Sequence, residues 1–174
     1  MQLIKPDFNI IEQKPGIEGI YKIIEQAGRT CYLSTDKITE DSAKKFVEML
    51  NVRHHLSVYE HGTVYLKIDF NYVDFSEKYD IPILPDIILK YINNKYTKTV
   101  IIENSSNYTA YITTNYRVIV ENKWEDDLQY LCEPTEHHEK RVTVRFICDR
   151  GVSHEFVRHR TMSFAQESTR QMAA

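Results

Sequence analysis

The sequence predicts an α+β fold in which helices flank a mainly antiparallel sheet. Two observations support this prediction: apolar residues recur every three to four positions in the first 50 residues, and they alternate with polar residues in later segments. The chain has 174 residues, of which 42% are hydrophobic and 27% charged, as is typical of one ordinary globular domain. We therefore expect a single domain over residues 1–174, and the composition disfavours a structural or linker role.

Two amphipathic helices are expected near the N-terminus. The first runs from Gly16 to Ala27 and should end near Gly28. Its apolar stripe consists of Ile17, Ile20, Tyr21 and Ile24. The second begins after Thr39, a plausible N-cap that is followed by two acidic residues at the positive end of the helix dipole. Its expected buried face is Ala43, Phe46, Val47 and Leu50.

Two segments show the alternation of a strand that is buried on one face. In the segment from Thr63 to Phe70, the residues expected to face inward are Val64, Leu66, Ile68 and Phe70, and those between them are Thr63, Tyr65, Lys67 and Asp69. In the segment from Arg141 to Cys148, the inward residues are Val142, Val144, Phe146 and Cys148.

The stretch between these strands is harder to assign. Pro82 and Pro85 interrupt a tyrosine-rich segment, and short runs at 100–102 and 108–112 indicate further strands. A helix is expected from about Asn115 to Leu131, with Thr113 or Thr114 as its cap. Its shared face is Tyr116, Val120, Trp124, Leu128 and Leu131. We interpret the region at about 71–140 as an insertion that adds strands to the sheet.

Charge and cysteine content narrow the possible functions and locations. The net charge of −3 provides no global positive field that would hold nucleic acid, so any anion site must be local. Cys31, Cys132 and Cys148 form neither a CxxC pair nor an even secreted framework, which favours a reducing compartment. No apolar run resembles a signal peptide or a membrane span. We expect a cytoplasmic protein with no membrane or nucleic-acid partner.

The densest cluster of ionisable side chains lies near the C-terminus. Arg158 and Arg160 flank His159, and Ser168 and Arg170 follow after an interval long enough for the chain to turn back. Guanidinium groups and a hydroxyl placed in this way can converge on one or two phosphates. The alternative is a solvated surface turn, but the apolar neighbours predict packing on both sides. These neighbours are Val152, Phe156, Val157, Met162, Phe164 and Ala165.

A second cluster, HHLSVYEH at residues 54–61, joins the second expected helix to the following strand. Its three histidines and one glutamate invite a zinc interpretation. The spacing is not HExxH, however, and no second carboxylate or thiolate lies nearby in the sequence, so we predict no metal site. His137 and His138, in TEHHEK, are expected in a polar hairpin or loop.

Arg158-His159-Arg160, followed after seven residues by Ser168, resembles the signature of the flavin-dependent thymidylate synthases. The setting DRGVSHEFVRHRTMSFAQESTR is similar to that family on both sides of the triplet. Upstream, AGRTCYLS resembles the family's segment after its first helix, TEDSAKKFVEML its second helix, and HLSVYEH its H-x-S-x-x-E-H element. The resemblance covers about residues 17–68 and 141–170. It implies the fold of the thymidylate synthase-complementing proteins, with 71–140 as an insertion.

The resemblance also implies a reaction, which is the reductive methylation of dUMP to dTMP. Methylenetetrahydrofolate gives the one-carbon unit, reduced FAD gives the hydride, and NADPH reduces the flavin again. Because the flavin performs the redox step, protein groups are expected to bind, orient and polarise. No nucleophilic cysteine is needed, so the three cysteines are expected to be structural. The implied assembly is a homotetramer.

The same resemblance implies roles for individual residues. Those that resemble flavin contacts are His55, Ser57, Glu60, Arg158, His159, Arg160, Thr161 and Gln166. Those that resemble dUMP contacts are Glu155, Phe156, Val157, Arg158, Gln166, Glu167, Ser168, Thr169 and Arg170. Arg158 and Arg160 are the expected catalytic residues, because their charge suits the reduced isoalloxazine or the uracil carbonyls. Ser168 is expected to bind phosphate rather than act as a nucleophile, since no general base lies beside it. His55 is either a flavin-side hydrogen-bonding group or only structural.

Two features depart from the family's pattern. After S-T-R the family usually continues with Tyr and a helical segment that holds further flavin contacts and an arginine thought to activate the uracil ring, whereas this chain reads QMAA. The triplet Asn115-Tyr116-Arg117 resembles the missing Asn-x-Arg but precedes the signature. We therefore expect little activity from this chain alone. The alternatives are a catalytically incomplete nucleotide- or flavin-binding fragment, a partner subunit, or a module that binds nucleotide or RNA phosphates without turnover.

Overall fold

The computed structural model describes residues 5–71, 74–75, 82–105, 107–159 and 161–168. It is an α+β structure whose strands all pair antiparallel within these residues, as the sequence predicts. The chain forms two compact units. The first consists of Met1–Lys14, Glu18–Gly62 and Arg141–Ala174, and the second of Pro15–Ile17 and Thr63–Lys140. No helix among the described residues is both long and apolar enough to cross a bilayer.

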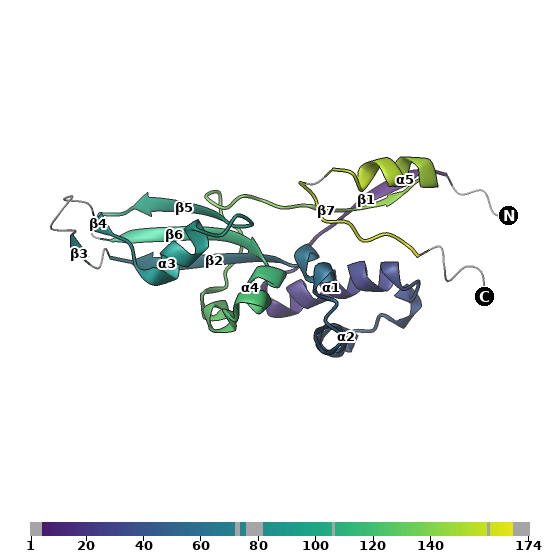
Figure 1. Ribbon diagram of the computed structural model, residues 1–174, viewed down its shortest axis with the longest axis horizontal. Helices are drawn as coiled ribbons and strands as arrows, with labels where there is room; N and C mark the ends of the chain where they lie inside the picture. Colours follow the sequence, from purple (N-terminus) through teal and green to yellow (C-terminus); the bar gives the residue numbers. More distant parts are fainter. Residues whose placement is uncertain (1–4, 72–73, 76–81, 106, 160, 169–174) are drawn as a thin grey trace. The chain divides into compact units, whose positions relative to one another are not determined.

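The first unit contains the two N-terminal helices, a two-stranded ribbon and a short C-terminal helix (Figure 1). Its elements are β1 (Asp7–Ile11), α1 (Gly16–Cys31), the 3₁₀ turn η1 (Thr35–Lys37), α2 (Ser42–Val52), η2 (Leu56–His61), β7 (Thr143–Ile147) and α5 (Arg150–Phe156). Both predicted helices are confirmed. All four residues expected on the buried face of α2 are buried, as are Ile20 and Ile24 of α1.

Two details of these helices differ from expectation. Gly28 does not end α1 but lies inside it, where a Cβ atom would come within 2.6 Å of the Phe46 ring. The glycine therefore allows α1 and α2 to approach closely. Thr39 is not the N-cap of α2. The helix begins at Ser42, whose hydroxyl accepts a hydrogen bond from the Thr39 backbone N–H at 2.9 Å.

Three helices end in the same way, with a non-glycine residue in the left-handed conformation. These residues are Leu33, His54 and Lys123, with φ angles of 49°, 55° and 59°. In each case the next residue donates its backbone N–H to the carbonyl five residues earlier: Ser34 to Arg29, His55 to Leu50, and Trp124 to Ile119. This pattern is the Schellman motif, which satisfies the last carbonyls of a helix and turns the chain sharply away.

The predicted strand at 141–148 forms, but its predicted burial is wrong. β7 pairs with β1 so that Phe8 lies opposite Phe146 and Ile10 opposite Val144. Val142 is 65% exposed and Phe146 is 52% exposed. Within the described residues β7 has β1 as its only paired strand, and α5 covers the ribbon in part, through Phe156 stacked on Phe146 with ring centroids 5.0 Å apart. The alternating apolar and polar residues give the ribbon one apolar face. Two strands alone leave most of that face exposed.

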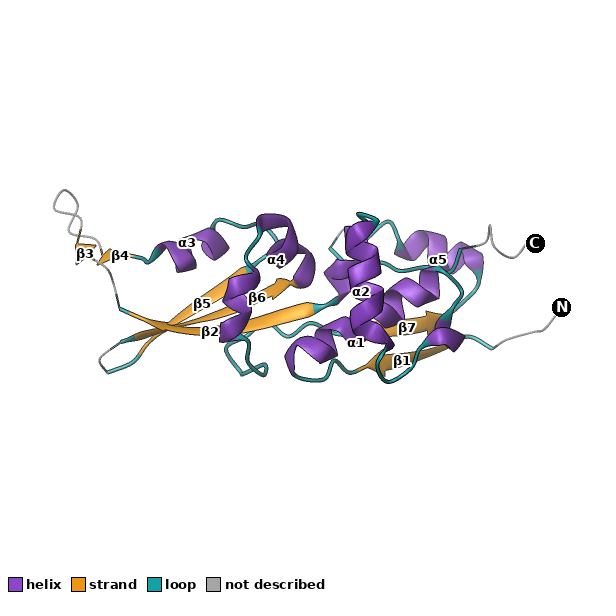
Figure 2. Ribbon diagram, turned by 90° about the horizontal axis from the view of Figure 1, so that it is seen from below, coloured by secondary structure: helices purple, strands orange, loops and turns teal. Residues whose placement is uncertain are grey.

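The second unit is built on a three-stranded sheet with the order β2–β6–β5. Its elements are β2 (Thr63–Phe70), β3 (Asp74–Phe75), β4 (Pro82–Ile83), α3 (Asp86–Ile92), β5 (Lys98–Glu103), β6 (Tyr108–Asn115), α4 (Tyr116–Asn122) and η3 (Glu125–Tyr130). Figure 2 shows α3 and α4 on one face of this sheet. The strands predicted at 63–70, 100–102 and 108–112 are confirmed as β2, β5 and β6. β3 pairs with β4.

The predicted helix from Asn115 to Leu131 is wrong, because the chain forms two shorter pieces. α4 ends at Asn122, and Lys123 takes the left-handed conformation before η3 begins at Glu125. The N-cap is Asn115, whose side-chain oxygen accepts from the Val118 N–H at 3.1 Å. Thr113 and Thr114 lie in β6 instead, so neither caps the helix.

His138 lies in a loop, as predicted, but it is buried. Its Nδ1 atom accepts a hydrogen bond from the Thr135 backbone N–H at 3.0 Å. The Nε2 atom lies 3.1 Å from the Leu66 carbonyl, to which it must donate. The ring also packs edge-on against Tyr65, with centroids 5.2 Å apart. This contact helps to explain why Tyr65 is buried, although alternation predicts that it faces outward.

We expect His138 to make stability fall in acid. Burial lowers the pKa of His138 from its ordinary value of 6.5. The unfolded chain therefore binds more protons below about pH 6.5, and the free energy of unfolding decreases there by at most about 1.4 kcal/mol per pH unit for this one group. Above about pH 6.5 the stabilising contribution of the neutral His138 side chain is fully present. Urea denaturation at pH 7.5 and pH 5.5 should show a smaller acid loss in His138→Gln than in the native chain; equal losses would contradict the assignment.

Candidate functional site

The HHLSVYEH segment begins where α2 ends, in the first unit. The Schellman motif at His54 places His55 at the start of η2, with its side chain exposed. The Tyr32 hydroxyl and His55 Nδ1 share a hydrogen bond at 2.6 Å, and the two rings stack with centroids 6.4 Å apart. Ser57 is also exposed. Both predicted flavin contacts in this part of the segment are therefore accessible to a ligand.

Glu60 and His61, at the end of η2, contact the segment that follows the Arg-His-Arg triplet. Ser163 Oγ donates to Glu60 Oε2 at 2.7 Å. Burial lowers the pKa of His61, although the charge of Glu60 and a hydrogen bond to the Phe164 backbone oppose that shift. These contacts join two segments that lie about 100 residues apart in the sequence.

The Arg-His-Arg triplet starts two residues after α5 ends at Phe156. Asp149 caps this helix by accepting from the Val152 N–H at 3.1 Å. Just beyond the helix, Arg158 Nη1 pairs with Glu155 at 2.9 Å, and their side chains are 72% and 67% exposed. His159 and Thr161 are exposed as well. Arg160, Thr169 and Arg170, for which catalytic, flavin or dUMP contacts are predicted, lie outside the described residues.

The segment after the triplet folds back onto the rest of the first unit. Gln166 Nε2 donates to Ser153 Oγ of α5 at 2.7 Å. The Gln166 backbone is also hydrogen-bonded to Cys31, at the end of α1. Glu167 is exposed, and Ser168 is half-buried. Among the described residues, no hydrogen bond or ion pair joins Arg158 to His55 or Ser57, so the structure does not bring all the predicted flavin contacts into direct contact.

The expectation that apolar residues pack on both sides of the signature is wrong for most of them. The exposed fractions are 44% for Val152, 44% for Val157, 53% for Met162 and 39% for Phe164. Phe156 and Ala165 are half-buried. A short apolar run in the sequence indicates that a surface is apolar. It does not indicate whether other residues of the same chain cover that surface. Arg158 is consequently solvated rather than held against a core.

The three cysteines are free and half-buried. Burial raises the pKa of Cys31 and that of Cys132, which disfavours the reactive thiolate at both positions. Among the described residues, no group of three or more His, Cys, Asp or Glu side chains is placed to hold a metal ion.

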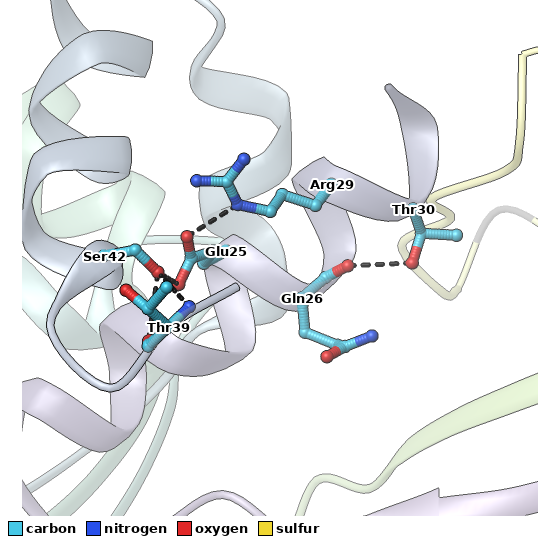
Figure 3. A network of polar contacts seen from close by, with 6 residues as sticks. All are labelled: Glu25, Gln26, Arg29, Thr30, Thr39 and Ser42. Carbon is cyan, nitrogen blue, oxygen red and sulfur yellow. Dashed lines mark hydrogen bonds and ion pairs between the residues drawn. The ribbon is translucent and has the colours of Figure 1, made fainter. Parts of the chain in front are cut away.

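Sequence reasoning missed a buried polar network on α1. Glu25 is 1% exposed and accepts hydrogen bonds from Arg29 Nε at 2.7 Å and from Ser42 Oγ at 2.9 Å (Figure 3). Arg29 lies within the AGRTCYLS segment. The available signal was the spacing of Glu25 and Arg29, an i,i+4 pair of opposite charge next to the apolar stripe of a helix.

The described part of the candidate site is thus a set of accessible polar side chains on η2 and after α5. The segment at 163–166 holds η2, α5 and the end of α1 together. No protein-family model, curated protein or solved structure matches the chain.

Proposed function

We propose that the chain is a flavin-dependent thymidylate synthase of the thymidylate synthase-complementing-protein fold, which binds FAD and dUMP in its first unit. One observation supports this proposal above the others. The three segments that resemble the family, at 27–34, 55–61 and 158–168, contact one another through Ser163, Phe164 and Gln166. Segments that build one ligand site must meet in space, and these do so across about 100 residues of sequence.

The polar side chains suit the anionic ligands of the reaction. FAD carries a diphosphate and dUMP a phosphate, and both are bound in proteins by guanidinium, hydroxyl and imidazole donors. Arg158 uses Nη1 for Glu155, and its Nε and Nη2 atoms bond to no described residue. His55, Ser57 and His159 add exposed donors. These residues therefore fit a phosphate-bearing, hydrogen-bonding ligand.

In the proposed reaction, methylenetetrahydrofolate donates its one-carbon unit to C5 of dUMP, and the C5 proton is released to solvent. When bound, FAD reduced by NADPH would supply the hydride that converts the transferred methylene into a methyl group. The protein groups bind and polarise: Arg158 stabilises negative charge on the uracil or flavin oxygens, and Ser168 donates to the dUMP phosphate. Arg160 and Arg170 are proposed to add further guanidinium donors.

The proposal includes a cytoplasmic homotetramer. The free cysteines support a reducing compartment. The apolar face of the β1–β7 ribbon supports association, because Phe8 and Ile10 are 64% and 66% exposed and lie opposite Phe146 and Val144. Contiguous exposed apolar surface of this kind is typical of an interface.

The test combines a visible absorbance spectrum, native mass, dUMP titration and tritium release from [5-³H]dUMP with FAD, NADPH and methylenetetrahydrofolate present. We expect a yellow oligomer that binds dUMP and releases tritium slowly, in keeping with the little activity expected of this chain alone. Arg158→Ala should reduce any turnover by about 10²–10³-fold, because it removes an electrostatic contact to the reacting groups. Arg145→Ala is the matched control and should change nothing, because it removes an exposed arginine from the face of β7 opposite to that of Val144 and Phe146.

Two results would decide against the enzyme. A colourless monomer that retains neither added FAD nor dUMP would contradict the whole proposal. Retention of FAD and dUMP without tritium release would instead support the alternative of a binding module or an incomplete enzyme. Equal turnover in Arg158→Ala and the native chain would remove Arg158 from the proposed mechanism.

A further inference from the structure

An open cleft of about 440 Å³ lies on the first unit, among α1, η1 and α2. Four of its lining residues are cationic: Arg29, Lys37, Lys45 and Arg53. Tyr32 and Phe46 also line it, and no aspartate or glutamate does. None of these residues belongs to the flavin and dUMP contacts proposed above. The cleft volume lies within the range of small-molecule sites, which is about 300–1,000 Å³.

Arg29 is held in place by the network drawn in Figure 3. The Arg29 Nε atom donates a hydrogen bond to the Glu25 carboxylate, and the guanidinium carbon of Arg29 lies 4.7 Å from the centre of the Phe46 ring. The side chain is only 14% exposed. Its two Nη atoms point away from Glu25 and make no hydrogen bond to any described residue. A fixed guanidinium with both terminal amino groups available is a preorganised anion donor.

The other three cations have no acidic partner among the described residues. No carboxylate among the described residues lies within 4.0 Å of Lys37, Lys45 or Arg53. Glu25 balances Arg29, so the cleft keeps three unbalanced positive charges in a chain whose net charge is −3. Isolated surface lysines are common and imply nothing. Four cations from α1, η1 and α2 with its C-terminal cap, placed around one concave surface, attract an anion of similar extent.

We propose that this cleft binds a nucleotide with a chain of two or three phosphates. A single phosphate would engage only part of a cleft of this size, whereas adjoining phosphates can meet several of the cations together. Guanidinium and ammonium groups are the usual donors to such phosphates. The Tyr32 ring gives the cleft an aromatic surface beside the cations, which a nucleobase can contact and an inorganic phosphate chain cannot. This proposal does not rest on thymidylate synthesis, although the Tyr32 hydroxyl also shares a hydrogen bond with His55, a proposed flavin contact.

The experiment is calorimetric titration of the purified chain with ATP, inorganic tripolyphosphate and inorganic phosphate, without flavin or dUMP. We expect ATP to bind more tightly than tripolyphosphate, phosphate to bind weakest, and added KCl to weaken all three. Lys45→Gln should raise the Kd for ATP about tenfold, the scale of one lost charge-assisted hydrogen bond. The double variant Lys37→Gln with Lys45→Gln should raise it about 100-fold.

Lys44→Gln is the matched control. Lys44 is exposed on the same helix and carries the same charge, but it does not line the cleft. It should leave the Kd for ATP unchanged, and thermal melting should show that all these surface variants remain folded. An equal loss of affinity in Lys44→Gln and Lys45→Gln, or no binding of ATP, would overturn the site. Equal affinities for ATP and tripolyphosphate would overturn its nucleotide specificity.

Discussion

Replacing Glu25 by alanine is expected to lower the free energy of unfolding by about 3 to 5 kcal/mol, the usual cost of removing one partner from a buried ion pair. Glu25 is 1% exposed and Arg29 14% exposed, so the remaining guanidinium would keep a largely buried charge without its partner. Ser42 would lose the acceptor for its hydroxyl as well. Because Ser42 starts α2, the change affects the contact between both helices.

Urea denaturation followed by far-ultraviolet circular dichroism measures this loss. Glu48→Ala is a suitable control, since it removes an exposed carboxylate from α2 and should change stability by no more than about 0.5 kcal/mol. A loss below about 1 kcal/mol in Glu25→Ala would mean that the network is not a stabilising feature of the first unit. Glu25→Gln keeps an acceptor for Ser42 and should fall between the native chain and Glu25→Ala.

In the second unit, Asp127→Ala is expected to cost about 3 kcal/mol. Asp127 Oδ2 accepts a 2.6 Å hydrogen bond from the buried Tyr91 hydroxyl and pairs with Lys90 at 2.6 Å. The variant would leave that hydroxyl without an acceptor and the ammonium without a counter-charge. Lys90 also lies 4.9 Å from the centre of the Trp124 ring, so its position depends on the same cluster. Burial and the bond to Asp127 raise the pKa of Tyr91.

Thermal and urea denaturation of three variants separate these contributions. Tyr91→Phe removes only the hydroxyl and should cost about 1–2 kcal/mol, less than Asp127→Ala. Asp126→Ala removes the exposed neighbouring carboxylate of η3 and should be close to neutral. If Asp126→Ala destabilises the chain as much as Asp127→Ala does, general charge effects rather than the buried cluster stabilise this unit.

The sequence by itself determined the elements whose formation depends on local periodicity. The apolar spacing in α1 and α2 and the alternation in β2 predicted these elements and most of their buried residues. The reason is that a helix or strand with one buried face needs the same period whatever packs against it. The sequence also determined the motif segments on which the proposed function rests.

The tertiary structure decided where the predicted helix ends and which strand residues are buried. Lys123 divides the helix predicted at 115–131, because a residue with no turn signature adopts a left-handed cap. The alternation in β7 predicted a strand correctly but not its exposure, since exposure depends on what other segments cover the ribbon. Beyond Lys123, Trp124 and Asp127 contact Tyr91 of α3, so in both cases contacts outside the local pattern take part in the outcome.

The candidate sites were decided by long-range contacts as well. Only the fold brings Ser163 to Glu60, or sets Lys37 and Arg53 around the guanidinium of Arg29. Apart from Glu60, which the resemblance singles out, each of these residues is an ordinary polar residue in the sequence. Spacing along a chain fixes which side chains share a face of one element, whereas a binding site needs side chains from several elements, and the packing of those elements alone determines which of them meet.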